Sequence, residues 1–97
     1  MALKIQFKKG EYSLQGRLCS SHSHEIFQFF KSKLNFHDHL TINLAGIDDL
    51  DLAAAIMLED LKKEAKRRDK PVEILLGMNK KILGPFRVLN PQMFEAA

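Results

Sequence analysis

Apolar and polar side chains alternate through the first eighteen residues of the chain. The apolar members of this alternation are Leu3, Ile5, Phe7, Tyr12, Leu14 and Leu18. A period of two is typical of a half-buried strand. Between the two runs, Lys8-Lys9-Gly10-Glu11 has turn chemistry, because glycine adopts a positive φ without steric cost. The pattern therefore predicts a β-hairpin.

Two later segments carry apolar residues at the spacing of an amphipathic helix. Residues 20–23 offer serine N-caps for the first helix, which ends near Asn35. Asp51 is the predicted N-cap of the second, which runs to about Arg68 and stops at Lys70-Pro71. The apolar positions are Ile26, Phe27, Phe30 and Leu34 in the first helix, and Leu58, Leu61 and Ala65 in the second.

Shorter apolar runs predict two further strands and a last helix. Residues 40–44 alternate until Gly46 breaks the strand, and residues 72–76 read as a strand buried on both faces. Asn79 is a candidate cap for a C-terminal helix that Gly84-Pro85 either interrupts or restarts. The apolar residues of that helix are Ile82, Leu83, Phe86 and Leu89.

The predicted order is β-β-α-β-α-β-α, and a chain of 97 residues has the length of one domain. Because crossover connections are right-handed, the strands joined by helices are parallel, while the opening hairpin is antiparallel. We therefore expect residues 1–97 to form a single α/β domain, with a mixed sheet of about four strands and packed helices.

The composition excludes several classes of protein. Hydrophobic residues make up 45% of the chain and charged residues 28%, which argues against disorder. No apolar run approaches the roughly 20 residues that cross a bilayer. Cys19 is the only cysteine, so no internal disulfide and no thiol-rich metal site can form. These features favour a cytoplasmic protein without direct membrane insertion.

A basic cluster occupies residues 62–70, with the sequence KKEAKRRDK. Such a cluster can contact phosphates on nucleic acid or a membrane surface. The alternative is a solvated helix end whose cations oppose the negative pole of the helix dipole. Glu64 and Asp69 dilute the cluster, and it contains no aromatic residue to stack on a base. The second interpretation is favoured, and no nucleic acid partner is expected.

Neither a metal site nor a catalytic site is expected. The pairs His22/His24 and His37/His39 are separated by a predicted helix of about 20 Å, so they do not form one zinc site. The aspartates near residue 50 lie in a wet turn, whereas acid–base catalysis needs a desolvated carboxyl group. No phosphate-binding glycine loop is present, and Cys19 reads as a small buried hydrophobe without an adjacent base. No cofactor is predicted.

One helix cannot direct three neighbouring phenylalanines into the same core. Phe29 is the member of residues 27–30 that we expect to be exposed, where it would contribute to an interface. Alternatively, a neighbouring loop or the C-terminal segment covers it.

Two stretches carry a resemblance to a known family. Residues 12–18, YSLQGRL, read as an apolar strand that ends in Gly-x-Leu, and residues 40–58, LTINLAGIDDLDLAAAIML, pass from a strand into a helix. With the strand at residues 72–77, they resemble the STAS domain, the family of bacterial anti-sigma factor antagonists that also occurs in transporters. In that family a strand ending in Asp-Leu-Ser is followed by Asp-Ser-Ser-Gly at a helix start. The resemblance covers nearly the whole chain.

The departures from the family pattern concern its regulation. Asn43 and Ala45 replace the strand's Asp and Ser, and Asp51 is followed by Leu52 where the family has its phosphorylated serine. No Ser, Thr or Tyr follows Thr41, so the second helix has no hydroxyl at its start. Phosphorylation at the usual place is therefore impossible.

The resemblance implies a protein-interaction module that binds a partner regulator, such as an anti-sigma factor of the GHKL kinase type. An alternative is the small STAS subunit of an ABC-type lipid transporter, which binds the ATPase subunit; a metal-binding or catalytic domain is a third reading. The residues predicted to bind the partner are Asp48, Asp49, Asp51, Leu52 and Ala53. For the three aspartates, capping by Asp51 and solvation of the other two is the competing interpretation.

Overall fold

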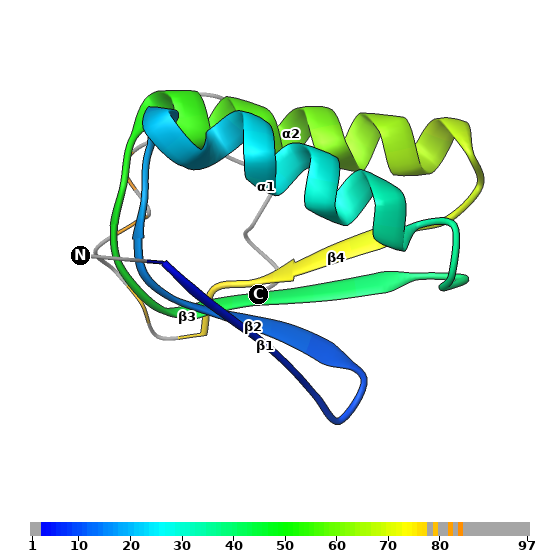
Figure 1. Cartoon of the computed structure of the whole chain (residues 1–97), viewed down its shortest axis with the longest axis horizontal. Coiled ribbons are helices and arrows are strands. Elements are labelled where there is room, and N and C mark those ends of the chain that lie inside the picture. Colours follow the sequence, from blue (N-terminus) through cyan, green and yellow to red (C-terminus); the bar gives the residue numbers. More distant parts are fainter. Residues whose placement is uncertain (1–2, 78, 80–81, 83, 85–97) are drawn as a thin grey trace.

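The computed structural model describes residues 3–77, 79, 82 and 84. Four strands form one sheet in the order β1-β2-β3-β4, and two helices cover one face of it (Figure 1). The elements are β1 (Lys4–Lys8), β2 (Glu11–Leu18), α1 (Ser20–Lys33), β3 (Leu40–Leu50), α2 (Leu52–Arg67) and β4 (Val72–Leu75). β1 is antiparallel to β2, whereas β2, β3 and β4 are parallel. The predicted mixed α/β sheet is confirmed, and the element order is confirmed as far as β4.

The opening hairpin closes with a two-residue turn. Lys9 and Gly10 have φ angles of 53° and 80°, and Lys8 pairs with Glu11 across the strands. Two consecutive residues with positive φ are typical of the type I′ turn, whose twist matches that of the strands. The turn thereby sets the register of the hairpin, in which Phe7 lies opposite Tyr12.

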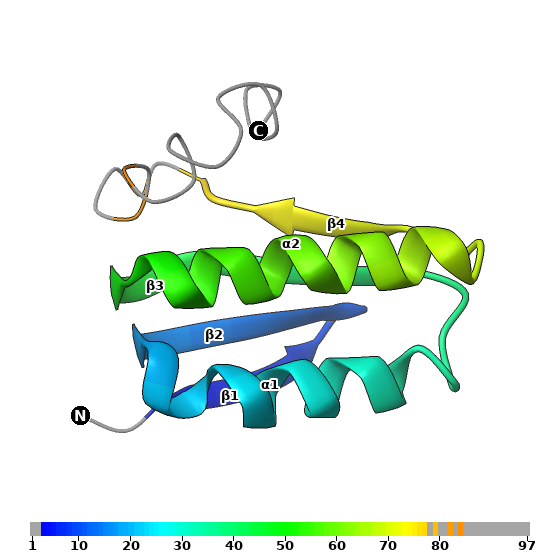
Figure 2. The ribbon, with the colours of Figure 1, turned by 90° about the horizontal axis from the view of Figure 1, so that it is seen from above.

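The core lies between the sheet and the two helices, which run side by side above it (Figure 2). Leu58, Leu61 and Ala65 of α2 are fully buried, as their spacing predicts. Ala54 and Ala55 are buried at the start of the same helix. The small alanine side chains allow close packing there, so the first turn of α2 is held firmly against the domain.

Gly46 does not end the third strand as predicted, because β3 continues to Leu50. The pairing of β3 with β2 shifts register twice, and each shift adds one residue to β3. Buried side chains therefore recur at every third residue, at Leu44, Ile47 and Leu50. Glycine is required at the first shift because an added Cβ would lie 2.9 Å from Cγ of Gln15. The residue permits close approach of two strands rather than breaking one.

The helix ends differ in part from prediction. Cys19, not one of the following serines, is the N-cap of α1, and its side chain makes no capping hydrogen bond. α2 ends at Arg67, where Asp69 takes a φ of 58° and the Lys70 amide donates to the carbonyl of Ala65 at 2.8 Å. This arrangement is a Schellman motif, so α2 stops before Pro71 is reached.

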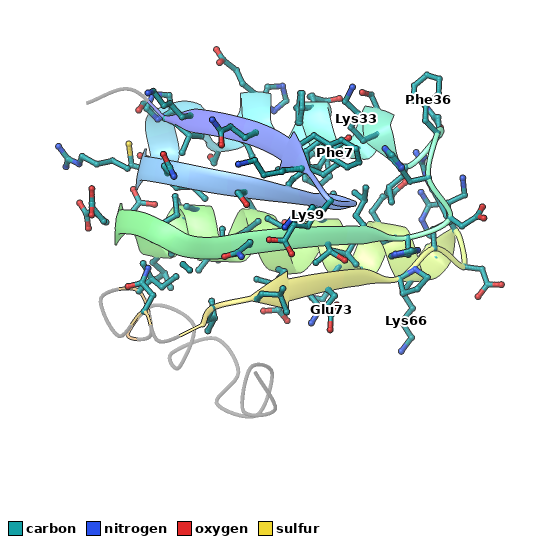
Figure 3. All side chains as sticks on the ribbon, turned by 90° about the horizontal axis from the view of Figure 1, so that it is seen from below. Phe7, Lys9, Lys33, Phe36, Lys66 and Glu73 are labelled. Carbon is teal, nitrogen blue, oxygen red and sulfur yellow. The ribbon has the colours of Figure 1, made fainter. Side chains whose placement is uncertain are left out.

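The sheet is covered on one face by the described helices, and its other face is seen in Figure 3. Val72 and Ile74 of β4 are buried, whereas Glu73 is exposed and Leu75 is half-buried. The prediction that β4 is buried on both faces is therefore wrong for Glu73. The predicted C-terminal helix falls largely outside the described residues, apart from Ile82, which is buried.

Phe29 is not the exposed aromatic residue that the sequence suggested. Its ring is half-buried and packs edge-on against Phe30 at 5.1 Å and Tyr12 at 5.9 Å. The hairpin reaches far enough under α1 to cover it. The exposed phenylalanines among the described residues are Phe7, at 55%, and Phe36, at 78%.

Candidate functional site

The candidate site lies where β3 passes into α2. The prediction that Asp48 and Asp49 lie in a turn is wrong, because both belong to β3, where they are exposed at the second register shift. Arg17 of β2 donates to Asp49 at 3.2 Å in an exposed ion pair. The added residue at the shift is what leaves two consecutive carboxylates on the outside of the strand.

Asp51 connects the starts of both helices. Its Oδ1 accepts from the Ala54 amide at 2.8 Å, which is the predicted N-cap of α2. Its Oδ2 accepts from the Ser20 amide at 2.8 Å, and Ser20 is the first residue of α1. One carboxylate thus satisfies an unpaired amide at each helix start, which explains why α1 has no capping side chain of its own. Asp51 is accounted for by this structural role.

The first turn of α2 presents apolar side chains to solvent. Leu52 is 44% exposed, and Ala53 beside it is also exposed. Ile56, which the sequence analysis missed, is 42% exposed. Residues four apart lie on the same helix face, so Leu52 and Ile56 form one apolar pair. The sequence already indicated this exposure, since Leu52 and Ile56 are apolar residues that do not fall on the buried stripe of α2.

A groove of about 310 Å³ lies beside this apolar pair, between α1 and α2. Its lining residues are Ser23, His24, Phe27, Ala53, Ile56, Met57 and Asp60. We call it the interhelical groove, and we call the exposed residues Asp48, Asp49, Leu52, Ala53 and Ile56 the α2 N-terminal surface. Ala53 and Ile56 belong to both features, so the groove adjoins the α2 N-terminal surface, and Asp60 adds a carboxylate to it.

Two asparagines support the backbone beneath this surface. Asn43 accepts from the Ala45 amide at 2.8 Å and donates to Glu11 at 2.9 Å. Asn79 donates from its side-chain amide to the carbonyls of Leu44, at 3.0 Å, and Ile47, at 2.7 Å. Asn43 thus satisfies a backbone amide of the bulged strand β3, and Asn79 satisfies two of its carbonyl groups.

Hydroxyl groups reach the surface from α1 rather than from α2. Leu52 occupies the first position of α2, and no hydroxyl residue follows Thr41 in the sequence. Ser23 nevertheless lines the interhelical groove, and the Ser20 amide bonds to Asp51. The prediction for the start of α2 concerned only residues near that helix in sequence, so it did not anticipate that α1 places Ser23 in the interhelical groove.

The two histidine pairs lie at opposite ends of α1. His22 and His24 are in the first turns of α1, while His37 follows that helix and bonds to the Tyr12 hydroxyl at 3.1 Å. Cys19 is half-buried instead of buried, with its sulfur 3.6 Å from Nδ1 of His22. Over the part of the chain that the structure describes, no three His, Cys, Asp or Glu side chains form a group able to hold a metal ion.

Two solved structures share the fold. The antisigma-factor antagonist STAS domain from Rhodobacter sphaeroides superimposes with a TM-score of 0.61 at 18% identity, covering 82% of this chain and 89% of that one. A structure described as Mglu gives a TM-score of 0.63 at 13% identity over 78% of this chain, which spans only 20% of the Mglu chain. At these identities the similarity shows the fold alone.

The sequence comparisons give a family but no individual relative. A search of curated proteins finds no significant match. No helix among the described residues is long and apolar enough to cross a bilayer. The sequence model of the STAS domain matches residues 3–89, which is most of the chain, and the protein therefore belongs to the STAS domain family.

Proposed function

We propose that the protein is a non-catalytic interaction module that binds a partner regulator through the α2 N-terminal surface and the interhelical groove. The observation that carries the proposal is the exposed pair Leu52 and Ile56 beside a groove that can receive an apolar side chain. Interfaces have an apolar centre with a polar rim, and a few buried anchors supply most of their binding energy.

Charge at the margin favours a basic partner. Asp48 and Asp49 are exposed on β3 shortly before the apolar pair, Asp60 lines the groove beside it, and Arg17 is paired with Asp49. Rim charges act mainly on the rate and selectivity of association rather than on affinity. We therefore expect Asp48→Asn with Asp49→Asn to slow association, whereas removal of Leu52 would accelerate dissociation. An unchanged dissociation constant in the Asp48/Asp49 variant would assign these carboxylates a solvated, passive role.

The partner class is inferred from the family. The similar structure from Rhodobacter sphaeroides is described as an antisigma-factor antagonist, so we infer a partner of the GHKL kinase type. Leu52 at the first position of α2 removes the family's usual phosphorylation site, so binding proceeds without that switch. The same loss suits a constitutively assembled subunit, and the ATPase subunit of an ABC-type lipid transporter is the second candidate partner.

Affinity purification from the source organism tests the proposal. The tagged wild-type chain is expected to retain one partner, identified by mass spectrometry as a GHKL-type kinase or a transporter ATPase. Leu52→Asp is expected to lose it, because a carboxylate would enter the apolar centre of the interface. Phe36→Asp is the matched control, since Phe36 is also an exposed apolar residue but lies in the α1–β3 connection (Figure 3). Equal retention by both variants would refute the assignment of this surface.

A further inference from the structure

The basic cluster at residues 62–70 is divided by the structure into two groups. Glu64 accepts hydrogen bonds from Arg67 at 2.7 Å and from Arg68 at 2.9 Å. These bonds, with the charges of both arginines, lower the pKa of Glu64 and keep the carboxylate ionised. The arginines are thereby engaged within α2, and they do not line the cavity that the lysines form.

The lysines of the cluster surround a cavity of about 400 Å³. Its lining residues are Glu59, Lys62, Lys63, Lys66, Asp69, Lys70, Pro71 and Val72. We call this the lysine groove. Residues 59, 62, 63 and 66 recur at helical spacing, so a single stripe of α2 forms one wall. Four lysines and two acidic residues are among the lining residues, so the residues around the groove carry an excess of positive charge.

The helix dipole explains only part of this charge. Cations stabilise a helix C-terminus within about its last turn, which accounts for Lys66 of the lysine groove. Lys62 and Lys63 lie a turn further back, where that stabilisation has faded. Lys63 approaches Glu59 at 4.0 Å, and Lys70 donates to the carbonyl of Leu34. The stripe therefore carries more positive charge than the helix end requires.

We propose that the lysine groove binds an acidic, extended peptide segment of a protein partner. Side chains of Lys62 and Lys66 start about 6 Å apart on α2. Alternate side chains of an extended peptide are separated by about 6.6 Å, so two acidic residues at alternate positions match these lysines. The intervening side chain points away from the α2 stripe, and Pro71 and Val72 add apolar lining to the groove. Figure 3 shows Lys66 extending past β4, which is the edge strand of the sheet.

Other occupants fit less well. A nucleic acid carries a phosphate at every nucleotide and binds best where aromatic residues stack on its bases, and no aromatic residue lines the lysine groove. The chain's own residues 85–97 contain one acidic residue, Glu95, and one basic residue, Arg87. Residues 85–97 therefore lack the repeated negative charge that would complement the lysines of α2.

Fluorescence anisotropy with a short labelled peptide that alternates glutamate with leucine tests the proposal. The variant Lys62→Gln with Lys66→Gln is expected to bind at least about fivefold more weakly, since two ion pairs are lost. Lys4→Gln with Lys8→Gln is the matched control, because it removes equal charge from β1 at the opposite edge of the sheet. Circular dichroism confirms that each variant is folded. Equal weakening in both variants would overturn the proposal.

Two further measurements separate the alternatives. In two-dimensional NMR, the peptide is expected to shift amide signals of residues 59–72; shifts centred on residues 48–56 would overturn the proposal. A peptide with glutamine in place of glutamate is expected not to bind. Tighter binding of oligothymidylate than of the acidic peptide, lost in the Lys62/Lys66 variant, would also overturn it. Leu52→Asp is expected to leave peptide affinity unchanged, so this test and that of the α2 N-terminal surface can fail independently.

Discussion

Replacement of Asp51 tests whether one carboxylate holds both helix starts. Loss of the N-cap of α2 costs about 1 kcal/mol, and loss of the hydrogen bond from the Ser20 amide costs roughly 1 kcal/mol more. We therefore expect Asp51→Ala to lower the free energy of unfolding by about 2 kcal/mol. For a domain of this size the melting temperature would fall by roughly 10 °C.

Asp51→Asn separates the two contributions. Its amide oxygen can still cap α2 through the Ala54 amide, but its NH₂ group cannot accept from Ser20. The expected loss is about half that of Asp51→Ala, or about 1 kcal/mol. Asp49→Ala is the control, since its exposed ion pair with Arg17 is worth at most about 1 kcal/mol.

Urea unfolding followed by circular dichroism at several concentrations gives the free energies. The reasoning would be refuted if Asp51→Ala were as stable as Asp49→Ala, or if the Asn and Ala variants of Asp51 were equally destabilised. The second result would mean that the contact between the two helix starts contributes nothing to stability, although the geometry is favourable.

Three further predictions follow from individual contacts. Gly46→Ala should lose about 1 kcal/mol in urea unfolding, because the new Cβ would meet the Gln15 side chain at 2.9 Å. Asn79→Ala should cost about 1 kcal/mol and speed amide hydrogen exchange at the end of β3, since two carbonyls lose their donor. Glu64→Gln should remove stability that is present above the ordinary carboxyl pKa of 4.5 and is lost as pH falls through the lowered pKa. The melting temperatures of Glu64→Gln and the exposed control Glu73→Gln should therefore differ at neutral pH and converge in acid. A difference that did not change with pH would contradict the stabilising role of ionised Glu64.

The sequence was sufficient for the features that depend on local periodicity. Alternation located the hairpin, and the helical spacing of Leu58, Leu61 and Ala65 identified the buried stripe of α2. Capping by Asp51 was predicted because an N-cap bonds to an amide only three residues away. These features require no knowledge of which distant segments meet.

Features set by the pairing of distant segments were not predictable in this way. The bulges of β3 depend on its register with β2, so Gly46 looked like a strand end rather than a close approach. The second hydrogen bond of Asp51 reaches Ser20, which is 31 residues away. Phe29 was expected to be exposed because nothing local indicates that Tyr12 of the hairpin lies beneath it. These three features each depend on a contact across the fold.

The two proposed surfaces differ in the sign of their charge. In both, some charged residues have no role in stabilising a helix end. Asp51 is used in capping, whereas Asp48 and Asp49 lie in β3, outside the helix whose start they flank. At the other end, Lys62 and Lys63 lie beyond the reach of the helix dipole. The surplus is therefore negative near the start of α2 and positive near its end.

Leu52 of the α2 N-terminal surface and Lys66 of the lysine groove lie about 20 Å apart along α2, at 1.5 Å per residue. At ordinary ionic strength the Debye length is about 8 Å, so a ligand at one surface scarcely alters the potential at the other. A partner at the α2 N-terminal surface and an acidic peptide in the lysine groove should consequently bind together and without competition. An acidic peptide that displaced the partner would show that the two surfaces are one, and the division of charge along α2 would then have no functional meaning.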